Sequence, residues 1–172
     1  GGAHGAFEAG VFEVLKARGI VPQEVLGVSV GAINAMSFMH LNSDISHHTW
    51  DTLTTDVVYE VDEVGVSRTD FTKTIATHLV GRHYINKESL RELIYPVVVH
   101  ELATPRLAEM TLVATEFPLL KAAPYSVTDE TTADELTDWI LASSAFYPVV
   151  SPVMINGMQY IDGGYSNNLP IN

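Results

Sequence analysis

The stretch Val25-Leu26-Gly27-Val28-Ser29-Val30-Gly31-Ala32-Ile33-Asn34-Ala35 decides the fold. Residues 25–28 form an apolar run too short for a helix, which predicts a buried strand. Small and apolar residues from 31 to about 40 predict a helix that is buried on most sides. Between the two, residues 27–31 match Gly-x-Ser-x-Gly, a sharp strand-to-helix turn that exposes a serine hydroxyl. Gly27 and Gly31 leave room where the two backbones converge, so Ser29 is a candidate nucleophile. A turn without a catalytic role is the alternative.

Further elements are predicted on both sides of this stretch. A helix is expected over about 6–18, with a buried stripe made of Phe7, Val11, Val14 and Leu15. Gly19 follows it at the position of a left-handed cap. Other helices are expected to begin at Asp70, at Asn86 with a stop at Pro96, and at Thr132 or Asp134. Strands are expected over 110–115 and 158–161. Helix, strand and helix in this order predict an α/β fold with a parallel sheet.

Composition excludes several classes of protein. The 172 residues include 9 Lys and Arg against 21 Asp and Glu, for a net charge of −12, which argues against binding nucleic acid or docking electrostatically on an anionic bilayer. Cysteine is absent, which excludes disulfides, thiolate zinc sites and thiol nucleophiles. No Cys/His cluster or His-Glu-x-x-His pattern predicts a metal site. No run of about 18 apolar residues predicts a membrane span.

The two ends of the chain lead to expectations about its extent. Gly1-Gly2-Ala3-His4-Gly5 is loop chemistry, so we expect residues to precede Gly1. The end at Asn172 closes no helix or turn, which raises the same expectation there. Residues 1–172 are expected to form a single domain, incomplete at these ends. The protein is expected to be soluble, and the cytoplasm is favoured, while secretion stays open because a leader would precede Gly1.

A serine hydroxyl needs a base to accept its proton. The order serine, acid, histidine of α/β-hydrolases is absent, because no histidine follows Asp162. A histidine earlier in the chain stays open as the base. Asp162 ends the predicted strand 158–161 and precedes Gly163 and Gly164. A carboxylate with an ordinary pKa of about 3.9 can act as a base if desolvation raises that pKa. A simple Asp-Gly turn is the alternative.

The opening glycines suggest an anion site. A glycine-rich loop that enters a helix presents free N–H groups and the positive end of the helix dipole. The anion would be either a nucleotide phosphate or the oxyanion of acyl transfer. The phosphate interpretation is the weaker one, because no Gly-Lys-Ser/Thr sequence ends the loop.

Taken together, these motifs resemble the patatin-like phospholipase family. That family's pattern is a Gly-Gly-Gly-x-Arg/Lys-Gly loop, a Gly-x-Ser-x-Gly turn and an Asp-Gly-Gly/Ala turn, and this chain has Gly1–Gly5, Gly27–Gly31 and Asp162–Gly164 in the same order. The flanks 142–148 and 167–170 are also similar to the family's. One departure is His4, which stands where the family has Arg or Lys. A second is that no strand precedes the loop in the sequence given.

The resemblance implies a three-layer α/β/α fold with a mainly parallel central sheet. It also implies a lipid acyl hydrolase of phospholipase A or lysophospholipase type, without a metal or other cofactor. Ser29 would be the nucleophile, Asp162 the base, and the oxyanion hole would be drawn from Gly1, Gly2, Ala3, His4, Gly5 and Val30. The implied partner is a lipid or phospholipid, with peripheral membrane contact through apolar side chains. A non-lipid esterase or thioesterase and an inactive lipid-binding homologue are the alternatives.

Overall fold

The computed structural model describes residues 4–40, 50 and 87–171. The described helices are α1 (Gly5–Ala17), α2 (Val30–His40), α6 (Lys87–Leu102), α7 (Ala133–Ser143) and the 3-10 helix η2 (Gly163–Tyr165). The strands are β1 (Glu24–Val28), β2 (Glu109–Phe117), β3 (Lys121–Ser126), β4 (Val153–Ile155) and β5 (Met158–Asp162). The predicted strands and the helices around them are therefore confirmed, and the helix expected at Asp70 lies outside the described residues.

Two helix ends follow the predicted capping. Thr132 precedes α7, and its hydroxyl accepts a hydrogen bond from the amide of Glu135 at 3.2 Å. Gly19 follows α1 with φ of 67°, a left-handed conformation that glycine adopts without a steric penalty. Both caps are local features, which is why the sequence alone indicated them.

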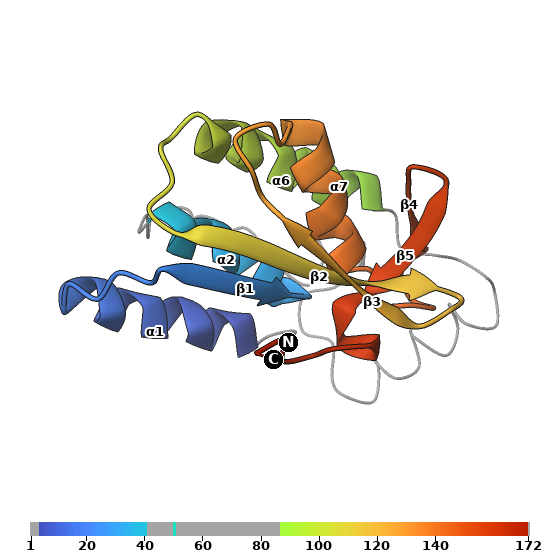
Figure 1. The fold of residues 1–172 in the computed structure, drawn as a ribbon, viewed down its shortest axis with the longest axis horizontal. Coiled ribbons are helices and arrows are strands. Elements are labelled where there is room, and N and C mark those ends of the chain that lie inside the picture. Colours follow the sequence, from blue (N-terminus) through green and yellow to red (C-terminus); the bar gives the residue numbers. More distant parts are fainter. Residues whose placement is uncertain (1–3, 41–49, 51–86, 172) are drawn as a thin grey trace, which may run out of the picture.

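The sheet is mixed. β1 pairs in parallel with β2, whereas β3 and β5 pair antiparallel with β2, and β4 pairs antiparallel with β5 (Figure 1). The α/β class is confirmed, but the described strands do not form the mainly parallel sheet that was expected. The reason is that β2–β3 and β4–β5 are hairpins. Asn156 and Gly157 both have positive φ between β4 and β5, the two-residue turn typical of a tight hairpin.

β1 and β5 share one side of β2. β3 pairs with residues 111–116 of β2 along one side, so the other side is left for β1 and β5. β1 pairs with residues 109–113 there, and β5 pairs with residues 114–117. The two strands run toward each other, because β1 is parallel to β2 and β5 is antiparallel to it. Their C-terminal ends, Val28 and Asp162, therefore meet opposite the neighbouring residues Val113 and Ala114.

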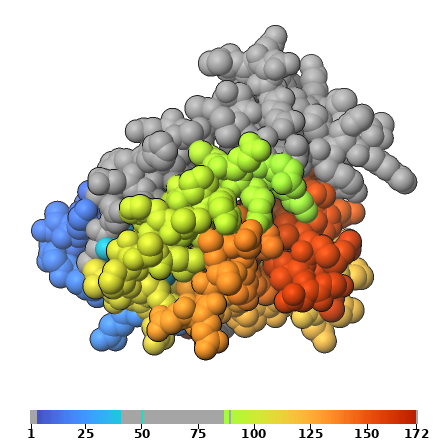
Figure 2. Space-filling view, turned by 90° about the horizontal axis from the view of Figure 1, so that it is seen from above, coloured from blue at the N-terminus to red at the C-terminus, as the bar shows by residue number. Residues whose placement is uncertain are grey.

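The main core lies between the sheet and the helices α2, α6 and α7. Leu112 and Ala114 of β2 face these helices, and both are buried in one cluster with Met36, Ile94 and Ile140. Figure 2 shows α6 and α7 side by side over this part of the molecule. The arrangement is consistent with a layered α/β architecture. None of the described helices combines the length and the apolar composition that a membrane crossing requires.

The buried face of α1 differs from the predicted one. Phe12 is fully buried and packs on Phe38 of α2, with ring centroids 4.4 Å apart. Phe7, Val11 and Val14 are exposed, Phe7 by 75%. Leu15 is half-buried, so the stripe predicted from spacing is wrong for Phe7, Val11 and Val14, and Phe12 makes the contact with α2 instead.

α6 continues through Pro96, where the sequence predicted a stop. A proline inside a helix removes one backbone hydrogen bond and crowds the preceding turn. Ile94 and Val98 lie on either side of Pro96, and both are buried in the main core. Burial of these two side chains holds the helix against the sheet and offsets the cost of the proline.

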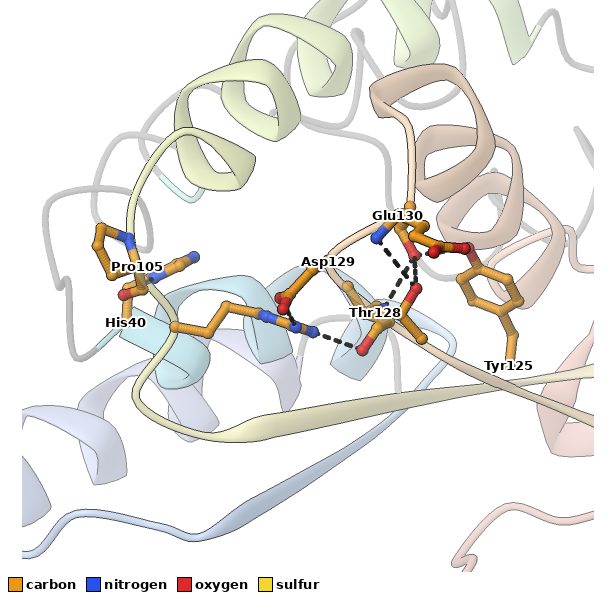
Figure 3. A network of polar contacts seen from close by, with 9 residues as sticks. His40, Pro105, Tyr125, Thr128, Asp129 and Glu130 are labelled. Carbon is orange, nitrogen blue, oxygen red and sulfur yellow. Dashed lines mark hydrogen bonds and ion pairs between the residues drawn. The ribbon is translucent and has the colours of Figure 1, made fainter.

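A polar network fixes the segment that leads into α7 (Figure 3). The guanidinium of Arg106 donates hydrogen bonds to the carbonyl of Val127 and to the Asp129 carboxylate. The hydroxyl of Thr131 lies 3.1 Å from that of Tyr125 and accepts a hydrogen bond from the amide of Thr128 at 2.9 Å. The loop before β2 and the segment between β3 and α7 are thereby joined, which positions the start of α7.

Candidate active site

Ser29 lies on the turn between β1 and α2, with φ of 57°. A positive φ is unfavourable for a residue other than glycine and is found at functional turns. Gly27 is required by space, because a Cβ there would lie 2.8 Å from the Cα of Ala32 and 2.9 Å from the carbonyl oxygen of Gly31. Glycine is not required by space at position 31, since a Cβ there would have its closest contact with the Glu8 side chain at 3.7 Å, an ordinary distance. The turn therefore has the strained strand-to-helix geometry that the motif predicts.

Ser29 and Asp162 meet across the end of the sheet. The hydroxyl of Ser29 donates a hydrogen bond of 2.6 Å to Oδ2 of Asp162. The other oxygen, Oδ1, accepts a hydrogen bond of 2.8 Å from the amide of Gly164 and caps η2. One oxygen of Asp162 therefore has the turn role that was the alternative interpretation, whereas the other oxygen accepts the hydrogen bond from the candidate nucleophile.

The turn after Asp162 depends on a glycine. A Cβ at Gly163 would lie 2.0 Å from the carbonyl oxygen of Val113, whereas one at Gly164 would meet only side-chain oxygens, the nearest at 3.1 Å. Thr115 of β2 donates a hydrogen bond of 2.8 Å to the carbonyl of Asp162. Close packing against β2 therefore sets the position of the carboxylate.

The environment of Asp162 suits a base. The residue is only 5% exposed. Burial raises the pKa of its carboxyl above the ordinary 3.8, and this exceeds the lowering of that pKa by the hydrogen bonds from Ser29 and Gly164. Burial also raises the pKa of the nearby Tyr165 phenol, and the charge of Asp162 raises it further. The carboxylate is therefore a stronger proton acceptor than an aspartate in water.

The candidate oxyanion residues are only partly described. Gly1, Gly2 and Ala3 lie outside the described residues. His4 precedes α1 and is exposed, and Gly5 is the buried first residue of that helix. Val30 begins α2, and a Cβ on Gly5 would lie 2.8 Å from its Cγ1. The N-terminal ends of α1 and α2 therefore converge beside Ser29, and both direct positive dipole ends to this region.

Asn34 joins these two helices, and the sequence had given it no role. Its side-chain nitrogen donates to the carbonyl of Gly5 at 2.9 Å and to the carboxylate of Glu8 at 3.0 Å. Its side-chain oxygen accepts a hydrogen bond of 2.9 Å from the indole of Trp50. An amide inside an otherwise apolar helix was the available signal, because a buried polar side chain needs partners.

Ser143 and Ser144 also contact the candidate nucleophile, through its backbone. They lie in the flank 142–148 that resembles the family, and that flank was the only signal in the sequence.

Of the described histidines, His40 and His100 both lie against Glu101, at 3.4 and 2.8 Å. In the part of the chain that the structure covers, no group of three or more acidic or histidine side chains could hold a metal ion.

Comparison with known proteins identifies the family. A search of the curated proteins finds no match. The model of the family described as patatin-like phospholipase matches residues 1–172, the whole chain. The chain therefore belongs to the patatin-like phospholipase family, whose members act on lipids.

Proposed function

We propose that the protein is a serine acyl hydrolase that cleaves carboxylic esters of lipids with Ser29 as nucleophile and Asp162 as base. The observation that carries this proposal is the 2.6 Å hydrogen bond from the Ser29 hydroxyl to the buried Asp162 carboxylate. A nucleophile and a base within 2.6–3.2 Å satisfy the geometric requirement for proton transfer.

The proposed reaction has two stages. Asp162 takes the proton of Ser29 while the serine oxygen forms a bond to the ester carbonyl carbon. The tetrahedral intermediate collapses when the bond to the alcohol oxygen breaks, and Asp162 returns the proton to the departing alcohol. A water molecule then attacks the acyl-enzyme with Asp162 again as base, and release of the fatty acid restores Ser29.

The negative oxygen of the intermediate requires hydrogen-bond donors. The first amides of a helix have no partner within the helix, so the amide of Val30 at the start of α2 is a suitable donor. The glycine loop at Gly1, Gly2 and Ala3 would supply further donors, with His4 and Gly5 holding it at the start of α1. The convergence of α1 and α2 supports this assignment, because two positive dipole ends stabilise the same charge.

We further propose a phospholipase A or lysophospholipase type of activity, with contact to the lipid surface through apolar side chains. Phe146 and Tyr165 support this contact, because both are exposed and their rings stack with centroids 5.9 Å apart. Tyr165 lies only three residues beyond Asp162. Exposed aromatic rings offer apolar area to lipid, and the hydroxyl of a tyrosine such as Tyr165 suits the boundary between water and lipid.

A fluorophosphonate probe tests the assignment of the nucleophile. We expect the wild-type protein to be labelled on Ser29, as located by peptide mass spectrometry, and Ser29→Ala to remain unlabelled. Ser126→Ala is the matched control, because Ser126 lies in β3 and its hydroxyl bonds to Thr111 at 3.1 Å. Equal labelling of wild type and Ser29→Ala would overturn the proposal. Saturable lipid binding without labelling would indicate an inactive lipid-binding homologue.

The pH dependence of kcat/KM tests the role of Asp162. A base works only when it is deprotonated, so activity should fall as the pH drops through the pKa of Asp162. Because burial raises that pKa, we expect the midpoint of this acidic limb to lie above 3.8, with a plateau at higher pH. Recovery of activity after return to neutral pH is the control for unfolding. A midpoint at or below 3.8 would contradict the assignment.

A further inference from the structure

The backbone of Ser29 is held from the C-terminal end of α7. The hydroxyl of Ser143 accepts a hydrogen bond of 3.0 Å from the amide of Ser29 and donates one of 2.7 Å to the carbonyl of Val113. Ser143 is fully buried, so water does not compete for its two hydrogen bonds. One hydroxyl therefore connects the nucleophile turn to β2, at the point where β1 and β5 meet.

The next two residues extend this connection. The hydroxyl of Ser144 donates a hydrogen bond of 3.1 Å to the carbonyl of Ser29. The carbonyl of Ala145 accepts one of 2.9 Å from the amide of Asp162. Three consecutive residues thus bind the nucleophile through both its backbone groups and bind the candidate base through its amide.

This attachment matters because the conformation of Ser29 is strained. A residue other than glycine with φ of 57° is in an unfavourable backbone conformation, which persists only where the surroundings fix it. The hydrogen bonds from Ser143 and Ser144 provide that fixation from outside the turn. The amide of Ser29 is itself bound to Ser143, so it is not a free donor for an oxyanion.

We propose that Ser143, Ser144 and Ala145 form a positioning clamp that fixes the nucleophile and the base in one geometry. The clamp contacts the backbone of both residues and neither reacting side chain, so Ser143 and Ser144 are positioning residues. The inference rests on the function proposed above, because it assigns the clamp to the reaction of Ser29 and Asp162.

Three substitutions and one control test the clamp. Ser143→Ala and Ser144→Ala each remove one hydroxyl, and Ser144→Thr keeps the hydroxyl at a partly exposed position. The control is Thr137→Val on the same helix. Thr137 is fully buried, and its hydroxyl bonds at 2.7 Å to the carbonyl of Ala133 within α7, away from the candidate site.

The first measurement is kcat per active site, counted by titration with the fluorophosphonate probe. We expect Ser143→Ala to lower kcat by about 10- to 100-fold with KM unchanged within about twofold, because small misalignments of reacting groups have effects of this size. Ser144→Ala should act in the same direction, and Ser144→Thr should restore kcat. Thr137→Val should leave kcat per active site unchanged.

The second measurement is the acidic limb of the pH profile. The hydrogen bond from Ser29 lowers the pKa of Asp162, so weakening it should let that pKa rise. The limb in Ser143→Ala should therefore move to higher pH. A loss of folding stability alone would lower the titrated fraction and leave both the limb and kcat per active site in place.

The third measurement, hydrogen exchange of the Ser29 amide followed by NMR, does not depend on catalysis. We expect this amide to exchange at least about tenfold faster in Ser143→Ala, with the amides of β2 unchanged. Unchanged exchange, or wild-type kcat per active site in both alanine variants, would overturn the clamp. If wild-type Ser29 is never labelled, the proposed function fails, and the catalytic part of the clamp fails with it. The hydrogen-exchange measurement then decides by itself whether Ser143 holds the backbone of Ser29.

Discussion

Asp162→Asn is expected to lower kcat by roughly 10⁴-fold or more while raising the melting temperature of the protein at neutral pH. The amide of asparagine is nearly the same size as the carboxylate but cannot accept the proton of Ser29. Loss of a residue that acts directly in proton transfer has effects of this order in serine hydrolases. Active-site titration and steady-state kinetics on a lipid ester measure the loss, and kcat within tenfold of wild type would contradict the role of Asp162.

The expected gain in stability follows from the direction of the pKa shift. The pKa of Asp162 is higher in the folded protein than in the unfolded chain, so the folded state binds the proton more tightly. The charged carboxylate therefore destabilises the fold above this raised pKa, and the penalty disappears as the pH falls through it toward 3.8. Asp162→Asn should accordingly show its largest gain in melting temperature near pH 7 and little gain near pH 4.

Asp129→Asn is the matched control for the change of charge. Asp129 is exposed in the segment before α7 and pairs with Arg106, away from the candidate site. We expect kcat to stay unchanged and the melting temperature to change little, because an exposed ion pair contributes at most about 1 kcal/mol. A similar loss of kcat in both variants would point to a long-range charge effect and not to a base.

Gly163→Ala is expected to destabilise the fold by about 3 kcal/mol or more. The added Cβ would lie 2.0 Å from the oxygen and 2.8 Å from the carbon of the Val113 carbonyl. Both are backbone atoms of the central strand, so either β2 or the turn after Asp162 must shift, and overpacking of this kind is costly. The shift also moves Asp162 away from Ser29, so the folded fraction should lose kcat as well.

Two other glycines form a graded control series, measured by chemical denaturation. Gly164→Ala should have a smaller effect, because the nearest atoms to its Cβ would be the side-chain oxygens of Asp162 and Asn168, at 3.1 and 3.3 Å, and not backbone atoms. Gly10→Ala in α1 should stabilise the protein by about 0.5–1 kcal/mol, since among the described residues nothing outside the adjoining helix backbone lies within 4 Å of the added Cβ. Equal stabilities of Gly163→Ala and Gly10→Ala would show that the turn is not packed as described.

The predictions of features that are set by neighbouring residues in the chain were confirmed. β1 and α2, the left-handed cap at Gly19 and the cap of α7 by Thr132 each follow from a few adjacent residues. Two other local predictions were wrong, because contacts with distant residues decide the features that they concerned. The buried side of α1 is set by Phe38 of another helix, and α6 passes Pro96 because buried neighbours hold it.

The candidate site divides in the same way. Sequence motifs singled out Ser29 and Asp162, but the reason for their contact is the pairing of β1 and β5 on one side of β2. The sequence predicted that Asp162 ends a strand, but it did not indicate that this strand pairs antiparallel with β2. The sequence indicated no role for Asn34 or Ser143, because both form hydrogen bonds with residues that are far away in the sequence. The turn Asn156-Gly157 was a readable hairpin signal, and it would have predicted the mixed sheet.

The meeting of β1 and β5 has a consequence for biosynthesis. Ser29 and Asp162 are separated by 133 positions, and translation produces the N-terminal side first. A nascent chain that has emerged only as far as β3 contains Ser29 without Asp162, and without Ser143 and Ser144, which hydrogen-bond to the backbone of Ser29. If Ser29 and Asp162 act as proposed, a nascent chain cannot hydrolyse an ester until β5 has been synthesised, and a translation product truncated before β5 would be inactive.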